Sequence, residues 1–201
     1  MNLIFSSVWS LKQELKIVLL AFILILSLPI AAVFMLTNAG IDIISNKLAT
    51  QNTKTQAVEI HDPKDGSVIA SITSSMHWPL SGVVTLEFGA IDLPYQPLHT
   101  GIDIANEKDT PVTPFMDGTV TYAGEIFWGY GKHIIIDNGN HTTSLYAHLD
   151  KIYVYPGEKV TMNQIIGAEG ETGWATGPHL HFETRVFGIP VNPRTFLAGN
   201  P

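Results

Sequence analysis

The chain from residue 77 to residue 201 is interrupted so often by glycine and proline that helices of ordinary length have almost no room to form. These 125 positions contain 15 glycines and 10 prolines, and the longest stretch without either runs only from 140 to 155. Glycine and proline are the residues least compatible with a helix interior. Short apolar runs separated by turn residues fill the segment instead, at 83–88, 101–105, 119–123, 132–137, 142–148, 159–160, 164–168 and 180–186. The sequence therefore predicts a mainly β domain at 77–201, compact and built of mostly antiparallel strands.

The N-terminal part of the chain has the opposite character. Residues 17–36 read IVLLAFILILSLPIAAVFML, in which only Ser27 and Pro29 interrupt the apolar residues. Twenty helical residues span the hydrocarbon core of a bilayer, about 30 Å, whereas the apolar region of a secretory signal has only about 7–15 residues. The sequence predicts an uncleaved transmembrane helix at 17–36, and Lys12 and Lys16 just before it place residues 1–16 in the cytoplasm and the rest outside. The alternative is a long signal peptide cleaved at 37–39, which would leave a secreted protein.

Residues 37–76 separate the apolar segment from the β domain. They contain no aromatic residue, and 15 of the 40 are Ser, Thr, Asn or Gln. Such a polar composition is typical of a spacer. Within it, the run at 58–69 has Pro63 and Gly66 in its middle, which predicts a small hairpin.

Composition also excludes several classes of function. The chain has no cysteine, so it holds no disulfide, no thiolate nucleophile and no Cys-ligated metal. Its net charge is −7, which disfavours binding to a phosphate backbone, and no nucleic-acid partner is expected. The helical zinc motif HExxH and the serine-hydrolase motif GxSxG are both absent.

Histidine is the residue type that points to chemistry. Seven of the eight histidines lie in residues 77–201, and His179 and His181 are two residues apart, which places them on one face of a strand. His99 precedes Asp103 by four residues, and Asp103 lies between two isoleucines, so its carboxylate projects from the opposite face. A catalytic zinc takes three protein ligands and keeps a fourth position open. His99, Asp103 and one histidine of the pair supply such a set, and spacing alone does not choose between His179 and His181.

Other polar and aromatic residues are less decisive. By strand alternation Tyr146 and His148 share one face, and by itself His148 is expected to be a capping or surface histidine. Glu183 is either a carboxylate that supports a metal ligand or a surface residue. His133 and His141 are expected to face solvent or to lie in turns. The loop aromatics either line a groove for an extended ligand or pack the loops, and these are Trp128, Tyr130 and Trp174.

Three motifs taken together resemble a known family. HxxxD at 99–103, YAH at 146–148 and TGPHLHFE at 176–183 occur in the order found in the M23 zinc endopeptidases of the lysostaphin/LytM type. The resemblance extends from about 78 to 196 and includes HTGIDIA, GTVTYAG and VNP. It implies a lysostaphin-like fold, one zinc ion per chain held by His99, Asp103 and His181, and two unliganded catalytic histidines, His148 and His179.

The resemblance also implies a function. Members of this family hydrolyse peptide bonds in the cross-links or stem peptides of bacterial peptidoglycan, so peptidoglycan peptides are expected partners. The apolar N-terminal helix makes the cytoplasmic membrane a second expected partner. One departure concerns Phe88-Gly89, which many members follow with an arginine two residues on, where this chain has Ile91. The alternative is a non-catalytic module that binds the cell wall or activates another hydrolase, although all five site positions are filled here. A carbohydrate-binding module is a third reading, suggested only by the loop aromatics.

Overall fold

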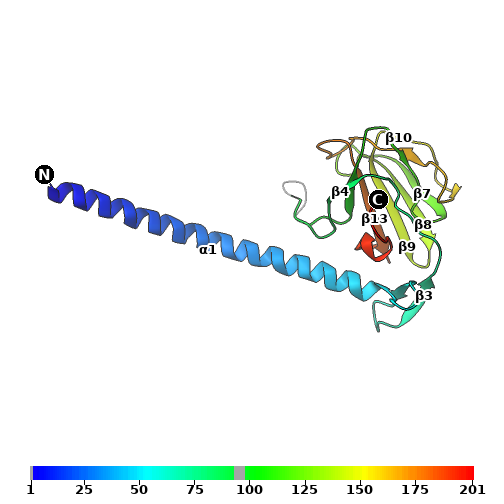
Figure 1. Cartoon of the computed structure of the whole chain (residues 1–201), viewed down its shortest axis with the longest axis horizontal. Coiled ribbons are helices and arrows are strands. Elements are labelled where there is room, and N and C mark those ends of the chain that lie inside the picture. The colour runs from blue at the N-terminus through cyan, green and yellow to red at the C-terminus, as the bar shows by residue number, and fades with distance from the viewer. Residues whose placement is uncertain (1, 93–97) are drawn as a thin grey trace. The chain divides into compact units, whose positions relative to one another are not determined.

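The computed structural model describes the backbone of residues 2–92 and 98–201, and the side chains of these residues except at 2–12, 26, 29–36 and 38. The chain forms two compact units, Met1–Ala39 and Gly40–Pro201. One long helix, α1 (Asn2–Leu48), makes up the first unit and continues into the second (Figure 1).

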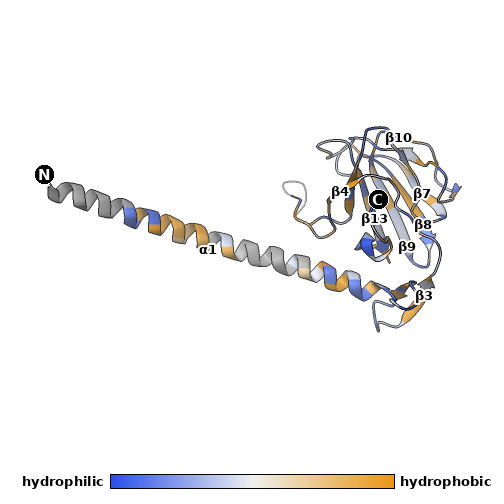
Figure 2. Ribbon diagram, in the orientation of Figure 1, coloured by the Kyte–Doolittle hydropathy of each residue, from blue (hydrophilic) through white to orange (hydrophobic). Residues whose placement is uncertain are grey.

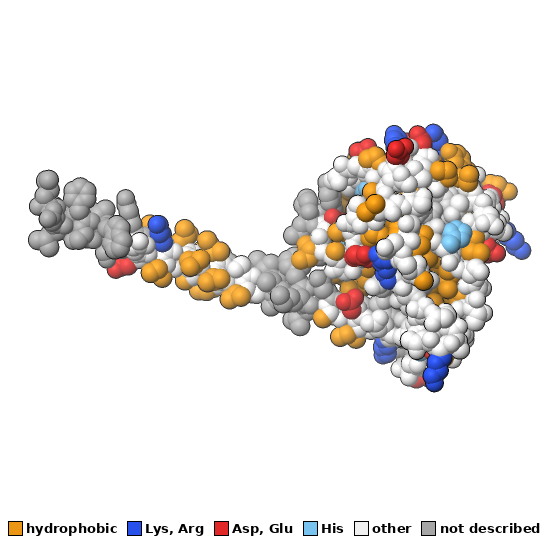
Figure 3. All heavy atoms as spheres, viewed as in Figure 1, with side chains coloured by type: hydrophobic (Ala, Val, Ile, Leu, Met, Phe, Trp, Pro, Cys, Tyr) orange, Lys and Arg blue, Asp and Glu red, His pale blue; other side chains and the backbone are white. Residues whose placement is uncertain are grey.

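The described part of α1 in the first unit is strongly apolar. The side chains at 17–20 and 22–25 are all hydrophobic and exposed, as the colouring of Figures 2 and 3 also shows. Within the described residues, no helix is both long and apolar enough to cross a membrane. Much of the predicted span at 17–36 lies outside the described side chains, namely residues 26 and 29–36, and the transmembrane helix is not confirmed.

A small antiparallel sheet follows α1 in the second unit. Its strands are β1 (Ala49–Gln51), β2 (Val58–His61) and β3 (Val68–Ile72), paired in that order. The turn between β2 and β3 contains Gly66 with φ of 74°, a left-handed conformation that glycine adopts without strain. Apolar side chains of this region join the core of the β domain, among them Leu48, Val58 and Ile60. The segment that the sequence predicts as a spacer therefore contributes to the core.

The main sheet has the strand order β11-β7-β8-β9-β13-β5-β4, with β14 also paired to β13. Every pairing in it is antiparallel. The strands are β4 (Val83–Leu86), β5 (Ile102–Ala105), β7 (Gly118–Glu125), β8 (Lys132–Gly139), β9 (Thr142–Leu149), β11 (Lys159–Val160), β13 (Leu180–Val186) and β14 (Ile189–Val191). These results confirm the predicted mainly β, antiparallel fold.

Short elements complete the domain. Strands β10 (Lys151–Ile152), β12 (Gly167–Ala168) and β6 (Pro111–Val112) form a separate three-stranded sheet. A single turn of 3-10 helix, η1 (Pro193–Thr195), follows β14 and is capped by the side chain of Asn192. Four short strands of two or three residues were not predicted from the sequence, namely β1, β6, β10 and β14.

The two faces of the central strands have different tasks. Ile102 and Ile104 of β5 and Phe182 of β13 are fully buried in the hydrophobic core. Tyr146 of β9 lies on the same side, where its hydroxyl accepts a hydrogen bond from the backbone N–H of Phe115 at 2.9 Å. The opposite face of β5 and β13 is therefore free to carry polar groups, and the candidate site lies there.

Candidate metal centre

The pairing of β5 with β13 brings two predicted ligands together. Asp103 and His181 are direct partners in the antiparallel register, so their side chains lie next to each other on one face. His99 comes from the segment before β5, whose backbone is held by two hydrogen bonds, from His99 to the carbonyl of Ala90 and from Gly89 to the carbonyl of His99. All three side chains are buried or nearly so.

Three atoms of these residues form what we call the ligand triangle. Nε2 of His99 lies 3.0 Å from Oδ1 of Asp103 and 2.9 Å from Nδ1 of His181, and the last two atoms are 2.8 Å apart. A tetrahedral zinc with ligands at about 2.0–2.1 Å separates them by about 3.3 Å. The triangle needs to open by only about 0.4 Å to hold such an ion. Among the described residues, this is the group of His and carboxylate side chains close enough to share a metal ion.

Hydrogen bonds on the far sides of the two rings fix which nitrogens carry protons. Nδ1 of His99 lies 3.1 Å from the carbonyl oxygen of Glu87, and Nε2 of His181 lies 3.1 Å from Oε1 of Glu183. These oxygens only accept hydrogen bonds, so the ring nitrogens that face them are the protonated ones. When both rings are neutral, each directs a lone pair into the ligand triangle, beside a carboxylate oxygen. Three electron-rich atoms at this distance need a cation between them, and the donor set fits zinc.

Ionisation within the cluster supports the same conclusion. Burial by itself would lower the pKa of His181, but hydrogen bonds to Asp103 and Glu183 overcome this and raise the pKa to about 9. Burial would raise the pKa of Asp103, but the hydrogen bonds and positive charge of the two histidines hold it well below its usual value. A proton can thus supply the missing positive charge, and a metal ion competes with that proton for the same place.

Glu183 is a supporting residue rather than a surface carboxylate. It is fully buried, and its Oε1 accepts hydrogen bonds from the hydroxyls of Thr100 at 2.6 Å and Tyr130 at 2.8 Å, in addition to His181. Its Oε2 lies 2.6 Å from the guanidinium of Arg185. Burial alone would raise its pKa, yet His181 and Arg185 lower the pKa to about 2. The carboxylate therefore stays ionised and fixes the ring of His181.

Replacing Glu183 by glutamine tests this support. The amide keeps the shape but has one acceptor oxygen where the carboxylate has two, and its NH₂ group would face donors. We expect Glu183→Gln to weaken zinc binding by about 10–100-fold, the usual cost of losing a partner of a metal-bound histidine. Competition with a zinc chelator measures the affinity, circular dichroism checks the fold, and Glu125→Gln on the exposed surface is the control. Unchanged affinity in a folded variant would contradict the assignment.

His148 and His179 lie beside the ligand triangle. Their ring centroids are 4.7 Å apart, and the ring of His148 is 5.8 Å from that of His181. Nδ1 of His148 donates to the carbonyl of Thr172 at 2.8 Å, and Nδ1 of His179 donates to the carbonyl of Gly177 at 2.9 Å. Nε2 of each ring is thereby left as the acceptor. Burial and the neighbouring His181 and His179 lower the pKa of His148 to about 3, so this ring is neutral at physiological pH.

The backbone of His148 corrects one prediction from the sequence. Alternation placed Tyr146 and His148 on the same face, but Tyr146 lies in the core and His148 lines the site. The reason is the φ of 62° at His148, a left-handed conformation that turns its side chain away from the strand pattern. Its N–H donates to the carbonyl of Tyr130 at 2.9 Å, where the register of the pairing between β8 and β9 shifts. Such strained residues persist where the surrounding structure holds them, often at functional sites.

Two further histidines, His133 and His141, lie outside the ligand triangle. His133 was expected at the surface or in a turn, but it is buried, stacks on Tyr122 with centroids 4.5 Å apart, and donates to the carbonyl of Gly131. Its stacking partner Tyr122 lies on the neighbouring strand β7, and this pairing could not be inferred from the local sequence. His141 lies in the turn before β9 and stacks on Phe187, as its place between strands indicated.

A pocket opens over the ligand triangle. Its volume is about 290 Å³, and its floor is made of the histidines and Asp103. Three loop aromatics of the sequence analysis line it, namely Trp128, Tyr130 and Trp174. Asp92 also lines the pocket, although the sequence offered no motif that would have singled it out. The aromatic loops therefore belong to a groove beside the candidate metal site.

Comparison with known proteins places this arrangement in a class. The domain is similar to the catalytic domain of the antimicrobial peptidase lysostaphin from Staphylococcus simulans, with 30% sequence identity and a TM-score of 0.54, covering 57% of this chain and 91% of that one. The antiparallel sheet and the His/Asp/His cluster thus define a lysostaphin-like β domain of the peptidase class. Residues 97–193 match the description "Peptidase family M23", and the chain belongs to that family.

Curated relatives fall into two groups. The chain is 46% identical over 104 residues to "DD-carboxypeptidase/endopeptidase Mpg" of Neisseria meningitidis, covering 52% of this chain and 24% of that protein. It is 39% identical over 124 residues to "Murein hydrolase activator NlpD" of Escherichia coli, covering 62% of this chain and 31% of that protein. The matches span only about a quarter to a third of these relatives. The family therefore includes both enzymes and an activator.

Proposed function

We propose that the chain is a zinc-dependent endopeptidase that hydrolyses peptide bonds in the cross-links or stem peptides of bacterial peptidoglycan. The ligand triangle carries this proposal, because two imidazole lone pairs and a carboxylate oxygen converge within 3.0 Å of one another. The similarity to a peptidase named for carboxypeptidase and endopeptidase activity supports the substrate class. His99, Asp103 and His181 would hold one zinc ion per chain.

The remaining histidines supply proton transfer. Zinc at such a site provides Lewis-acid chemistry for a peptide carbonyl and an attacking water. Nε2 of a neutral His148 or His179 accepts the proton that the water loses, since Nδ1 of each ring already donates to a backbone carbonyl. A ring N–H at the same place stabilises negative charge on the carbonyl oxygen and returns a proton to the leaving amine. The two histidines share these tasks.

Digestion of purified muropeptides by the full chain is the direct test. Mass spectrometry of the products identifies the bond that is cleaved. We expect cleavage that stops when the protein is dialysed against a chelator and returns on addition of one equivalent of zinc. Full activity in a metal-free sample would contradict the proposal.

The second candidate function is activation of another cell-wall hydrolase. The similarity to NlpD favours it, whereas the filled HxxxD and HxH positions favour catalysis. To distinguish activation from catalysis, the chain is mixed with peptidoglycan alone, and with peptidoglycan together with a separate amidase. An activator accelerates the amidase but releases no product on its own.

We also propose that residues 17–36 anchor the chain in the cell membrane, with residues 37–201 outside the cytoplasm, where peptidoglycan is found. The continuous apolar sequence supports this. We expect the full-length protein in the membrane fraction, with its N-terminus intact on sequencing. As a control for peripheral attachment, detergent should release the protein from the membrane fraction, whereas high salt should not. A soluble mature protein that begins near Gly40 would contradict the anchor and leave the enzymatic proposal intact.

A further inference from the structure

One face of β13 carries three polar side chains in a row. His181, Glu183 and Arg185 are two residues apart along the strand, so they point to the side opposite Phe182, which lies in the core. Oε1 of Glu183 accepts from Nε2 of His181 at 3.1 Å, and Oε2 accepts from Nε of Arg185 at 2.6 Å. The orientation of the candidate ligand at one end of the row therefore depends on contacts farther along the strand.

Tyr130, from the loop between β7 and β8, lies across this row. Its ring centroid is 5.8 Å from that of His181. Its hydroxyl donates to Oε1 of Glu183 at 2.8 Å and accepts from Nη2 of Arg185 at 3.1 Å. Burial and the negative charge of Glu183 raise the pKa of Tyr130 to about 12, so the hydroxyl keeps its proton at neutral pH. The tyrosine thus binds both the supporting carboxylate and the arginine next to it.

The backbone of Tyr130 contacts the other half of the candidate site. Its carbonyl accepts the backbone N–H of His148 at 2.9 Å. His148 has a φ of 62°, a left-handed conformation that a residue with a side chain adopts only where its surroundings hold it. The hydrogen bond from His148 to Tyr130 is one of the contacts that hold it there.

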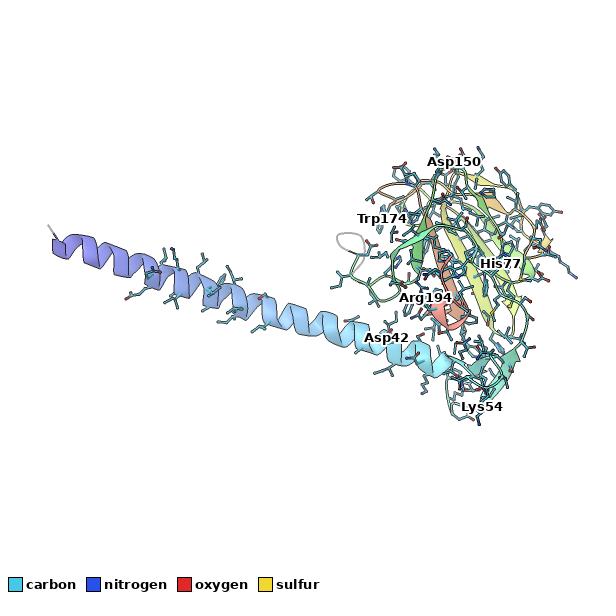
Figure 4. All side chains as sticks on the ribbon, in the orientation of Figure 1. Asp42, Lys54, His77, Asp150, Trp174 and Arg194 are labelled. Carbon is cyan, nitrogen blue, oxygen red and sulfur yellow. The ribbon has the colours of Figure 1, made fainter. Side chains whose placement is uncertain are left out.

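The loop that carries Tyr130 is fixed on both sides. The carbonyl of Gly129 accepts the N–H of Trp174 at 2.9 Å, and Figure 4 shows Trp174 at the edge of the domain. A Cβ atom on Gly131 would collide with Thr172, so the two loops approach as closely as glycine allows. The neighbours of Tyr130 therefore hold its carbonyl and its ring in one place.

We infer that Tyr130 is a positioning residue that couples the candidate metal ligand His181 to the candidate catalytic ring of His148. Its hydroxyl acts on His181 through Glu183, and its carbonyl holds the backbone of His148. One residue therefore helps to set the separation of the two rings, whose centroids are 5.8 Å apart. Metal-bound histidines depend on such outer partners for their orientation. The inference rests on the proposed function for the role of the metal, whereas the hydrogen bonds can be tested without zinc.

Hydrogen exchange in the metal-free full chain tests the two contacts separately. NMR follows the Nε2–H proton of His181 and the backbone N–H of His148. In Tyr130→Phe, which keeps the ring and removes the hydroxyl, we expect the His181 proton to exchange about tenfold faster, while the His148 amide stays protected. In Tyr130→Ala, which also removes the ring that packs the loop, both protons should exchange faster. Circular dichroism checks that each variant is folded.

Zinc affinity measures the consequence for the metal. We expect Tyr130→Phe to weaken zinc binding by about three- to tenfold, less than Glu183→Gln, because Thr100 and Arg185 still bind the carboxylate. The loss should be smaller when Glu183→Gln is already present, since a neutral amide accepts a weaker hydrogen bond. Competition with a chelator gives the affinities. Tyr155→Phe makes the same chemical change at a tyrosine that is 67% exposed, and it should alter neither affinity nor exchange.

The outcomes separate this inference from the proposed function. Unchanged zinc affinity and unchanged exchange in a folded Tyr130→Phe protein would overturn it. A rate that falls at saturating zinc while the affinity stays unchanged would place the hydroxyl on the substrate and would also overturn it. Protection of the His148 amide that persists in Tyr130→Ala would remove the coupling to His148. A wild-type chain that binds no zinc contradicts the proposed function, and the exchange rates then decide the inference by themselves.

Discussion

Asp103→Ala is expected to remove zinc binding and peptidase activity together. Its Oδ1 is 3.0 Å from the ring nitrogen of His99 and 2.8 Å from that of His181, so one atom completes both sides of the ligand triangle. Without it, two neutral imidazoles remain, which are fewer ligands than a catalytic zinc takes. Metal analysis of the purified protein and a muropeptide assay measure the two losses.

Two companion variants make this result specific. Asp103→Asn keeps the volume and removes the charge, so a loss of zinc in this variant excludes a packing effect. Asp137→Ala, on the exposed side of β8, should retain stoichiometric zinc and full activity. A folded Asp103→Ala protein that still binds one zinc would show that the site lies elsewhere.

The sequence predicted the faces of strands better than their partners. Asp103 was expected to project away from two isoleucines, and Ile102 and Ile104 are indeed fully buried on the other face. Local alternation contains this information, because neighbouring side chains point to opposite sides. The register that sets Asp103 opposite His181 is not local, since it depends on pairing residues 78 positions apart. The family resemblance, not the spacing, selected His181 as the expected ligand.

Other features escaped prediction because they arise from several elements at once. The sequence did not distinguish a supporting Glu183 from a surface one, because its partners Thr100 and Tyr130 lie on segments remote in sequence. The orientation of His148 depends on a single left-handed backbone angle, which periodicity does not encode. The helix extends beyond the predicted membrane span at 17–36 and runs from Asn2 to Leu48, and near its C-terminal end Ser45 Oγ accepts a hydrogen bond from the N–H of Asn192 in the β domain.

The two roles assigned to histidine lead to different losses when each ring is removed. His181→Ala is expected to lose the metal, because Nδ1 of His181 is a corner of the ligand triangle. His148→Ala and His179→Ala should keep near-stoichiometric zinc, since their Nδ1 atoms bond to backbone carbonyls outside the triangle. Their rates should nevertheless fall by at least about a hundredfold, because general acid–base catalysis is typically worth 10²–10⁴. Metal content and rate are measured on the same purified samples.

The combination of outcomes decides the assignment within the pair. His141→Ala, in the turn before β9, is the control and should change neither zinc content nor rate. If His179→Ala loses zinc while His181→Ala retains it, the ligand and the catalytic ring are exchanged. If all three site variants retain zinc, the metal does not bind at the ligand triangle. Retained zinc with an unchanged rate in both His148→Ala and His179→Ala would show that the attacking water loses its proton to a group other than these two rings.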